Sequence, residues 1–370
     1  MHSAPANIIG FGRDTSVREL MKPLAQWLTD DAVTEIAINK PGVVFVEIGP
    51  KWHRFEIGEM SMDRCMRLAN AIATFSEQEI SPRAPIMSAM LPDGERIQIV
   101  VPPAVEHDHI SITIRRPSRD IRTLDEYESS GAFGRYLWGK SKHLETYRKH
   151  LDDIDARLVG HLESNRLADF LRLAVRGKKN IAVVGDTGSG KTTLMKSICQ
   201  YIAEHERLIS IEDVRELFLP HDNRVHLLYS KGGQGVAKVT PTDLIASNMR
   251  MKPDRVLLAE LRGGEAFDFL KLLTTGHSGS ITSYHAESCA LAAERYVFMC
   301  KENDQAAIYD AKELKRLVSL TIDIIIHVVS RVVYDDAGQA VKKERFVAEV
   351  HFDPVGKLMT RFANADIHHA

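Results

Sequence analysis

The stretch NIAVVGDTGSGKTT, residues 180–193, decides the fold. It matches the pattern G-x-x-x-x-G-K-[ST] at every fixed position. An apolar run precedes the pattern and helical spacing follows it, so the sequence predicts a strand, a loop and a helix. In such a loop the backbone N–H groups point at phosphate oxygens, aided by the positive end of the helix. We therefore expect a nucleotide phosphate site made by Gly185, Asp186, Thr187, Gly188, Ser189, Gly190, Lys191, Thr192 and Thr193.

Two side chains of this loop have predicted roles. Lys191 is expected to reach the β- and γ-phosphates, and the hydroxyl of Thr192 to hold Mg²⁺. A chance glycine-rich turn is the alternative, and the flanking strand and helix disfavour it. Guanine recognition in small GTPases uses Asn-Lys-x-Asp after the loop, whereas the only Asn-Lys here, Asn39-Lys40, lies before it. The sequence therefore predicts ATP as the nucleotide, with Mg²⁺ as its cofactor.

Two apolar stretches downstream of the loop end in acidic residues. Residues 209–213 read ISIED, and residues 255–260 read RVLLAE. Carboxylates at the carboxyl ends of such strands can hold Mg²⁺ or polarise the attacking water. We assign water activation to Glu212, and support of the Mg²⁺ and water shell to Glu260; the opposite assignment is the alternative. A helix N-cap at Asp213 would explain the first pair of acids equally well.

Two histidines bracket a short apolar segment in TGHSGSITSYHA, residues 275–286. Small residues before the segment permit close backbone approach. His277 and His285 are therefore expected to sense the γ-phosphate by hydrogen bonding and to relay its loss to the next subunit. A structural histidine is the alternative for either of them. A zinc site is not expected, because no cysteine or acid lies at ligand spacing.

Composition and charge limit the remaining classes of protein. The 370 residues carry 48 Lys and Arg against 50 Asp and Glu, a net charge of -2, which argues against a protein that coats nucleic acid. The cysteines are scattered without a C-x-x-C pair, which indicates reduced thiols. The apolar run 317–333 is interrupted by Asp323, His327 and Arg331. It predicts a buried strand rather than a membrane span, and the protein is expected to be soluble and cytoplasmic.

Helix and strand patterns divide the chain into three parts. Residues 1–118 mix helical spacing with alternating strands and predict a smaller α+β domain. Residues 119–164 lose the strand signal and gain charge, which predicts a helical linker; a basic binding patch is the less favoured alternative. Residues 165–370 alternate strands with helices and predict an α/β domain with a parallel, helix-flanked sheet.

Together these motifs resemble those of the secretion ATPase superfamily, which drives type II and type IV secretion, pilus assembly and conjugation. Its four signatures occur in order: a Walker A loop at 185–193, an Asp box from Ile211, a Walker B segment through Glu260, and a His box at 276–286. The stretches LPDGER, residues 91–96, and SITIRRP, residues 111–117, resemble the traffic ATPases of type IV secretion systems. The tetracysteine zinc motif of type II secretion and pilus-extension relatives is absent from this sequence.

The resemblance implies a hexameric ATPase with a RecA-like P-loop domain, whose nucleotide lies between the two domains. It also implies that Arg96 and Arg115 of the N-terminal domain reach the nucleotide, Arg115 in the manner of an arginine finger. An ordinary exposed strand-end arginine is the alternative for Arg115. The linker is long enough to permit exchange of domains between subunits. Gly232 to Gly235 predict a flexible insertion.

The resemblance also implies partners and a location. Expected partners are further copies of the chain in a homohexameric ring, the ATPases and channel components of an inner-membrane secretion system, and a translocated protein or DNA–protein substrate. The chain would associate peripherally with the cytoplasmic face of the inner membrane through these partners. It would energise substrate translocation or pilus biogenesis by ATP-driven domain motion.

Three other functions compete with this one. A pilus-assembly or retraction motor of the same superfamily is the nearest. A motor that translocates nucleic acid would need a basic pore and interleaved aromatic and basic residues, which the sequence lacks. A nucleotide-binding regulator with slow turnover is the third.

Overall fold

The computed structural model describes residues 12–116, 121–229 and 239–365, and within them the polypeptide divides into two units. One unit contains residues 12–116, and the other is built mainly from residues 121–229, 239–333 and 343–365. In these described ranges, no helix combines the length and apolarity needed to cross a bilayer. The predicted flexible insertion at Gly232 to Gly235 lies outside the described residues.

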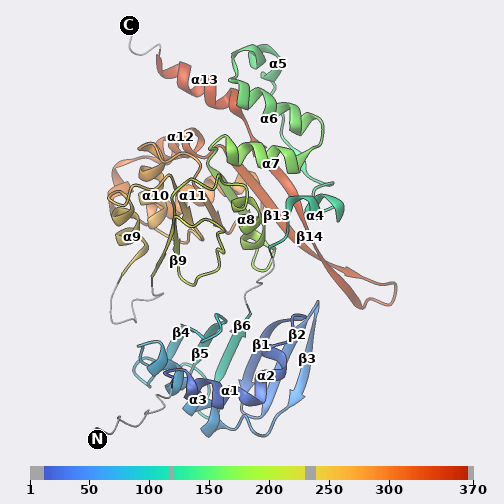
Figure 1. Ribbon diagram of the computed structural model, residues 1–370, viewed down its shortest axis with the longest axis vertical. Coiled ribbons are helices and arrows are strands. Elements are labelled where there is room, and N and C mark those ends of the chain that lie inside the picture. Colours follow the sequence, from blue (N-terminus) through green and yellow to red (C-terminus); the bar gives the residue numbers. More distant parts are fainter. Residues whose placement is uncertain (1–11, 117–120, 230–238, 366–370) are drawn as a thin grey trace, which may run out of the picture. The chain divides into compact units, whose positions relative to one another are not determined.

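The N-terminal unit is an antiparallel sheet with helices packed on one face (Figure 1). Strand alternation turns Ile97 and Ile112 toward Leu68 and Ile72 of a helix that begins after the N-cap Ser61. The sheet order is β3-β2-β1-β6-β5-β4. The strands are β1 (Val33–Lys40), β2 (Val43–Ile48), β3 (Lys51–Glu56), β4 (Ile86–Met90), β5 (Arg96–Val100) and β6 (Ser111–Arg115), and the helices are α1 (Thr15–Met21), η1 (Lys22–Leu24), α2 (Ala25–Leu28) and α3 (Met62–Phe75).

The second unit contains an eight-stranded sheet in the order β10-β9-β11-β12-β8-β13-β14-β7. The five neighbouring pairs from β10 to β13 are all parallel, which confirms the predicted α/β architecture. Its strands are β7 (Leu137–Trp138), β8 (Ile181–Gly185), β9 (Leu208–Glu212), β10 (Arg224–Leu228), β11 (Arg255–Leu258), β12 (Ile281–Tyr284), β13 (Ile324–Tyr334) and β14 (Ala340–Phe352).

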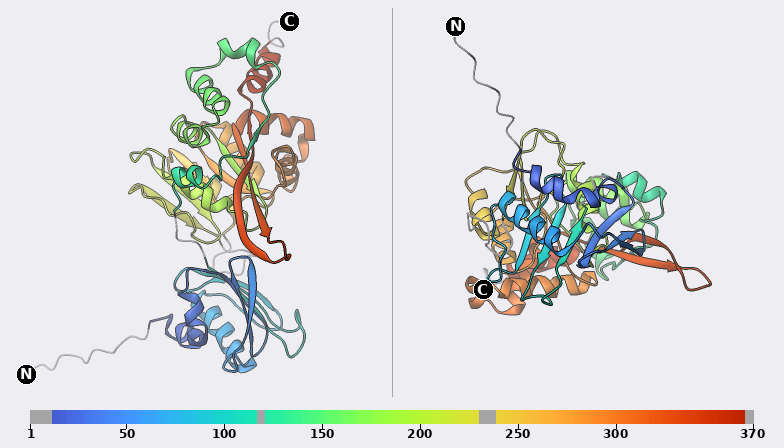
Figure 2. Two further views of the ribbon diagram at one scale, coloured as in Figure 1. Left: turned by 90° about the vertical axis from the view of Figure 1, so that its right-hand side faces the viewer. Right: turned by 90° about the horizontal axis from the view of Figure 1, so that it is seen from below.

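Helices cover both faces of this sheet (Figures 1 and 2). Alternate residues of β8 enter the two cores, Ile181 and Val183 one of them, Ala182 and Val184 the other. A strand buried on both faces is continuously apolar, which is why this sequence reads IAVVG. The helices on the first face are α4 (Leu124–Ser129), α6 (Asp153–Glu163), α7 (Leu167–Arg176) and α8 (Lys191–Cys199); those on the second are α9 (Pro241–Asn248), α10 (Glu265–Thr274), α11 (Cys289–Lys301) and α12 (Ala311–Thr321).

The segment predicted as a helical linker, residues 119–164, contains the helices α4, α5 (Leu144–Tyr147) and α6 and the short strand β7, and it packs within the second unit. Leu124, Leu144 and Leu158 are buried in the same core as α7 and α8. Short elements α5 and η2 (Arg148–His150) connect to α6. Several charged residues of this segment pair with one another, since Lys140 and Arg148 both contact Glu145 and Glu163.

The C-terminal third differs in detail from the expected pattern. A strand was predicted over 317–333, but a capping box of Asp310 and Glu313 starts α12, which continues to Thr321 before β13 begins. The strand β14 and the helix α13 (Pro354–Ala365) were not predicted. β13 and β14 form a long hairpin that extends beyond the rest of the sheet (Figure 2).

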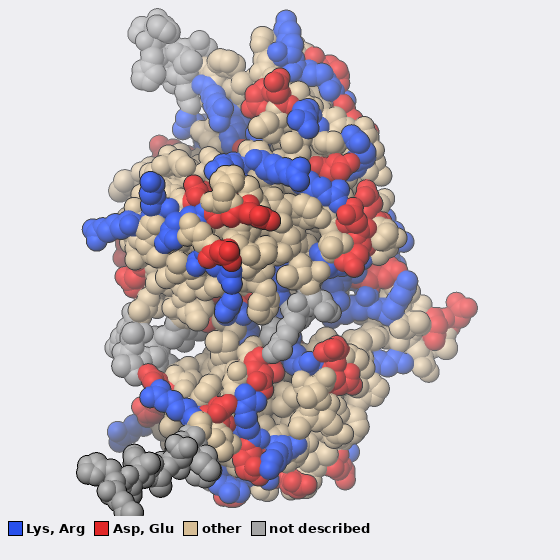
Figure 3. All heavy atoms as spheres, viewed as in Figure 1, with Lys and Arg blue, Asp and Glu red and all other residues tan. Residues whose placement is uncertain are grey.

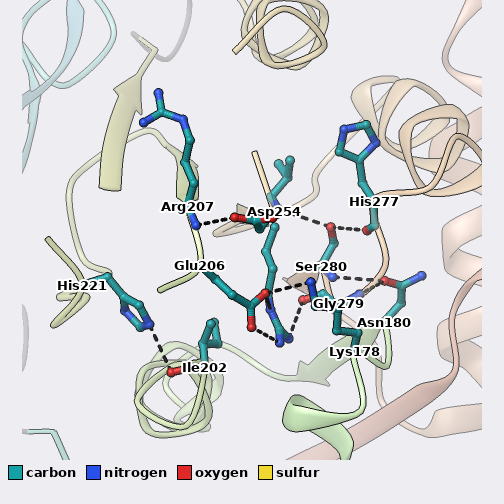
Figure 4. Close-up of polar contacts among 12 residues, drawn as sticks. Lys178, Asn180, Ile202, Glu206, Arg207, His221, Asp254, His277, Gly279 and Ser280 are labelled. Atoms are coloured by element: carbon teal, nitrogen blue, oxygen red, sulfur yellow. Dashed lines mark hydrogen bonds and ion pairs between the residues drawn. The ribbon is translucent and has the colours of Figure 1, made fainter. Parts of the chain in front are cut away.

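A buried ion pair lies at the amino-terminal edge of the parallel sheet (Figure 4). Arg255, which is fully buried, donates from Nε and Nη2 to the carboxylate of Glu206 at 2.8 and 2.7 Å. Nζ of Lys178 lies 3.2 Å from the same carboxylate. Burial alone would raise the pKa of Glu206. The hydrogen bonds that it accepts from Arg255 and Lys178, together with the positive charges of these residues, outweigh burial and lower the pKa to about 2. The carboxylate therefore compensates the buried guanidinium.

Replacing Glu206 with Gln leaves Arg255 buried without its counter-charge, and we expect the free energy of unfolding at pH 7 to fall by about 3 kcal/mol. The pKa of Glu206 in the folded protein lies below the unfolded value of about 4.3. Its stabilisation is therefore complete above that value and is lost as the pH falls toward 2. Denaturant unfolding across this pH range measures both effects, with the exposed Glu204→Gln as control. A Glu206→Gln protein as stable as wild type at pH 7 would contradict this account.

Candidate active site

The predicted phosphate loop joins β8 to α8, and two of its glycines have conformations that require glycine. Gly185 has φ +152°, and a Cβ there would lie 2.1 Å from the carbonyl oxygen of Val328 on β13. Gly190 has φ +99° and is the N-cap of α8, which begins at Lys191. The loop therefore requires glycine at these two positions, one for its backbone conformation and one for its close approach to β13.

Lys191 lies at the centre of the loop. Its Nζ donates to the carbonyls of Gly185 and Asp186, at 2.9 Å each. The hydroxyl of Ser189 is buried with no hydrogen-bond partner. Phosphate oxygens are acceptors that can take over the donors of Lys191 and Ser189, so these residues fit the predicted phosphate site.

The first turn of α8 supplies the remaining predicted loop residues. Thr192 and Thr193 are half-buried there, next to the amino end of the helix. Among the described residues, no cluster of three or more His, Cys, Asp or Glu side chains is arranged to hold a metal ion. At nucleotide sites Mg²⁺ is usually bound by one or two protein ligands together with phosphate oxygens.

A chain of polar contacts connects the loop to the acidic motifs. His285 Nδ1 lies 3.4 Å from Lys191 Nζ, and its Nε2 lies 3.0 Å from Glu260 Oε1. Arg262 continues the chain, with Nη2 2.7 Å from Glu260 Oε2 and Nη1 2.9 Å from Asp213 Oδ2. The parallel strands β8, β9, β11 and β12 end at one edge of the sheet and bring these side chains together.

Glu260 is ionised in this arrangement. Burial by itself raises the pKa of its carboxyl, but the hydrogen bond and charge of Arg262, with a further contribution from His285, lower it below the ordinary value. The pKa of the Arg262 guanidinium is raised, because the charges of Asp213 and Glu260 outweigh the effect of its burial. A carboxylate held ionised beside the phosphate loop can bind a metal ion or accept a proton from water.

Glu212 is placed differently from Glu260. It is fully buried, and its Oε2 accepts the backbone N–H groups of Glu216 and Leu217 at 2.7 and 2.8 Å. Its Oε1 lies 2.6 Å from the hydroxyl of Ser210 and 3.1 Å from Nδ1 of His226. With both oxygens engaged, the carboxylate stabilises the turn after β9, and the helix that would have made Asp213 an N-cap does not form at residues 213–220.

His277 does not join this cluster within the chain. β12 runs parallel to β8 with Ile281 opposite Ile181, so His277 lies before the amino end of β12, whereas His285 follows its carboxyl end. Its carbonyl accepts a hydrogen bond from the hydroxyl of Ser280 (Figure 4). Of the two histidines, only His285 therefore lies at the edge of the sheet where the phosphate loop begins, and the predicted role of His277 in sensing the γ-phosphate and relaying its loss to the next subunit stays a prediction.

Arg96 and Arg115 are brought together in the N-terminal unit. They stand directly opposite each other on β5 and β6, and Glu35 of β1 is the next residue across from Arg115. Arg115 Nε lies 3.9 Å from Glu35 Oε1, and its side chain is 46% exposed. Like charges directly opposite each other destabilise a sheet, and the Glu35 carboxylate offsets part of this effect at Arg115.

Two arginines in contact with the site were missed by sequence reasoning. Arg262 lies two residues after Glu260, directly beyond the quoted residues 255–260, so its position was a usable signal. Arg345 of β14 donates from Nε to the carbonyl of Gly188 at 3.0 Å. Nothing in the local sequence near Arg345 indicates contact with a loop more than a hundred residues earlier.

Known proteins resemble this chain along most of its length. The model of the family described as Type II/IV secretion system protein matches residues 138–359. Type IV secretion system protein VirB11 of Brucella suis biovar 1 is 44% identical over 345 residues, covering 92% of this chain and 91% of that protein. Type IV secretion system protein PtlH of Bordetella pertussis is 40% identical over 338 residues, covering 90% of this chain and 94% of that protein.

Solved structures agree with these sequence relatives. The crystal structure of the VirB11 ATPase from the Brucella suis type IV secretion system in complex with sulphate is 43% identical, with a TM-score of 0.52, covering 95% of this chain and 98% of that chain. The pilus retraction motor PilT with bound ADP shares the fold at 14% identity and a TM-score of 0.54, covering 95% of this chain and 88% of that chain.

The geometry of Glu212 predicts a structural effect. In Glu212→Gln, one acceptor oxygen replaces two, so we expect the free energy of unfolding to fall by about 2 kcal/mol. The amide protons of Glu216 and Leu217 should also exchange faster with solvent. Thermal unfolding and hydrogen exchange measure both, with Glu204→Gln as control. Unchanged stability with a complete loss of turnover would instead support the role of Glu212 in activating water.

Proposed function

This chain belongs to the Type II/IV secretion system protein family, and from that premise we propose that it is an ATPase that energises type IV secretion. The observation that carries the proposal is the contact chain from Lys191 through His285 to Glu260, at the mouth of the phosphate loop. The likeness to VirB11 and PtlH over nine-tenths of the chain supports the assignment to type IV secretion.

Each loop residue has a chemical task in this proposal. Lys191 exchanges the carbonyls of Gly185 and Asp186 for the β- and γ-phosphates, and its charge offsets the charge of the transferring group. The N–H groups at the start of α8 bind phosphate oxygens in the helix dipole. Thr192 and Glu260 would hold Mg²⁺, which neutralises developing charge on the phosphates when bound.

We propose Glu260, rather than Glu212, as the acid that activates water. Glu260 is ionised, partly exposed and one histidine away from Lys191, whereas Glu212 has polar contacts to Ser210, His226 and two backbone N–H groups. His285 contacts both Lys191 and Glu260, so it is suited to report whether a γ-phosphate is present. Arg262 holds Glu260 in place through its second oxygen.

We further propose that the active form is a homohexameric ring, and that Arg96 and Arg115 of the N-terminal unit contribute to nucleotide binding. The cross-strand placement of Arg96 and Arg115 supports this, because it puts two arginines, whose guanidinium groups suit phosphate, on one face of the sheet. The chain would act at the cytoplasmic face of the inner membrane with the other ATPases and channel components of its secretion system. It would move protein or DNA–protein substrates, or build a pilus, by motion between its two units.

The rival functions have less support. A pilus motor shares the fold, but the likeness to PilT is 14% identity against 44% to VirB11. A motor that translocates nucleic acid needs a continuous basic track. On the face shown in Figure 3, acidic and basic side chains are mixed over both units instead. ATP hydrolysis that is unchanged by single- or double-stranded DNA would separate the two activities.

Two substitutions separate nucleotide binding from turnover. Lys191→Ala should weaken binding of Mg-ATP by about 100-fold or more, because a charge-assisted phosphate contact is lost. Glu260→Gln should retain binding, while kcat falls by about 100-fold or more. Equilibrium binding of a fluorescent ATP analogue and phosphate release measure the two steps. The exposed Glu287→Gln, two residues beyond His285, is the matched control.

These assays are best run on protein whose oligomeric state is measured in parallel. The proposed ATPase function would be contradicted if the wild-type protein bound ATP but released no phosphate, even as a hexamer with its membrane partners. A Glu260→Gln protein with wild-type turnover would return the role in activating water to Glu212.

A further inference from the structure

Two cationic side chains of β14 lie against the glycines of the phosphate loop. Nε of Arg345 donates to the carbonyl of Gly188 at 3.0 Å, and its Cδ would lie 3.2 Å from a Cβ on Gly190. Nζ of Lys343 would lie 3.7 Å from a Cβ on Gly188. Neither residue belongs to the Walker A, Asp box, Walker B or His box segments.

The placement of these side chains follows from the strand that carries them. Residues two apart on a strand point to the same side, so Lys343 and Arg345 share one face with Val347. Val347 is buried in the core of this unit, and its N–H donates to the carbonyl of Ala132 at 2.9 Å. This anchor fixes β14 next to the loop, because β13 alone separates β14 from β8 in the sheet.

The peptide between Gly188 and Ser189 is fixed from both sides. Its N–H donates to the carbonyl of Asp186 at 3.2 Å, the same carbonyl that accepts from Lys191 Nζ. Its C=O points the opposite way, as it does in a trans peptide, and accepts from Arg345. The contact with Arg345 therefore keeps the Ser189 N–H directed to the inside of the loop, where Lys191 lies.

The contact acts on a peptide next to glycine, with a second glycine, Gly190, following Ser189. Gly188 has φ +72° and Gly190 has φ +99°, and a residue without Cβ crosses between backbone regions at little cost. A peptide that rotated would turn a carbonyl oxygen, rather than an N–H, toward an incoming phosphate. Such an orientation would repel the anion that the loop is built to bind.

We propose that Arg345 is a positioning residue that holds the phosphate loop ready for nucleotide, and that Lys343 adds positive charge beside the same phosphates. The proposal rests on nucleotide binding by the loop, the function proposed above. It makes the β13–β14 hairpin part of the nucleotide site of its own chain, in addition to any contribution from a neighbouring unit.

The test compares nucleotide affinity in four variants of the full-length protein. Arg345→Ala should raise the Kd for both Mg-ADP and Mg-ATP by about 10- to 100-fold, because the loop N–H groups bind phosphates that both nucleotides share. Arg345→Lys keeps the charge but not the planar guanidinium, and should recover only part of the affinity. Lys343→Ala should have a smaller effect that shrinks as salt is raised. Arg331→Ala, an exposed arginine of the same hairpin, should bind as wild type does.

Two further readouts separate positioning from general destabilisation. Free guanidinium at sub-denaturing concentration should restore part of the affinity of Arg345→Ala, and hydrogen exchange of the Ser189 amide should be faster in this variant, with an unchanged melting temperature. Wild-type affinity in Arg345→Ala, together with lost affinity in Lys191→Ala, would overturn the inference while the proposed function stands. Absence of nucleotide binding by the wild-type protein would remove the proposed function itself. Equal loss of affinity and of melting temperature in both Arg345 variants would also overturn the inference, since it would indicate a packing role.

Discussion

The backbone of β13 lies where a side chain of Gly185 would be, with the Val328 oxygen 2.1 Å from the position of a Cβ. This close approach lets β8 end in a tight loop instead of continuing, and it fixes β13 beside that loop. Because β13 carries β14 with it, the hairpin places Arg345 at the Gly188 carbonyl. The same sheet edge collects the ends of β9, β11 and β12, from which the acidic and histidine side chains of the site project.

Charge around the loop is balanced by pairs rather than by isolated groups. Lys191, His285 and Glu260 are in contact in sequence, and Arg262 ties Glu260 to Asp213. Such a network can respond as a unit when a phosphate replaces the carbonyls that Lys191 now contacts. Loss of the γ-phosphate on hydrolysis would then change the contacts of Asp213 in the Asp box through this chain of side chains. Isolated buried acids would not be connected in this way, and burying each charge without a partner would cost free energy.

The sequence was sufficient for features whose residues are contiguous. The loop glycines, the parallel sheet and the family could be predicted, because each depends on local spacing or on ordered motifs. Local sequence does not show where distant residues contact one group. Glu212 ends a strand as a metal-binding acid would, yet the backbone N–H groups of Glu216 and Leu217 occupy it. His277 lies at the opposite end of β12 from His285, and Arg345 gave no local signal at all, because only the sheet order brings it to the loop.

The most direct measurement is a structure of the protein with Mg²⁺ and a non-hydrolysable ATP analogue. Our account predicts that Lys191 leaves the carbonyls of Gly185 and Asp186 for phosphate oxygens and that Glu260 lies against the metal ion or the attacking water. Glu212 should keep its bonds to the turn after β9. A structure in which Glu212 has left that turn to face the γ-phosphate, with Glu260 remote from it, would contradict the account.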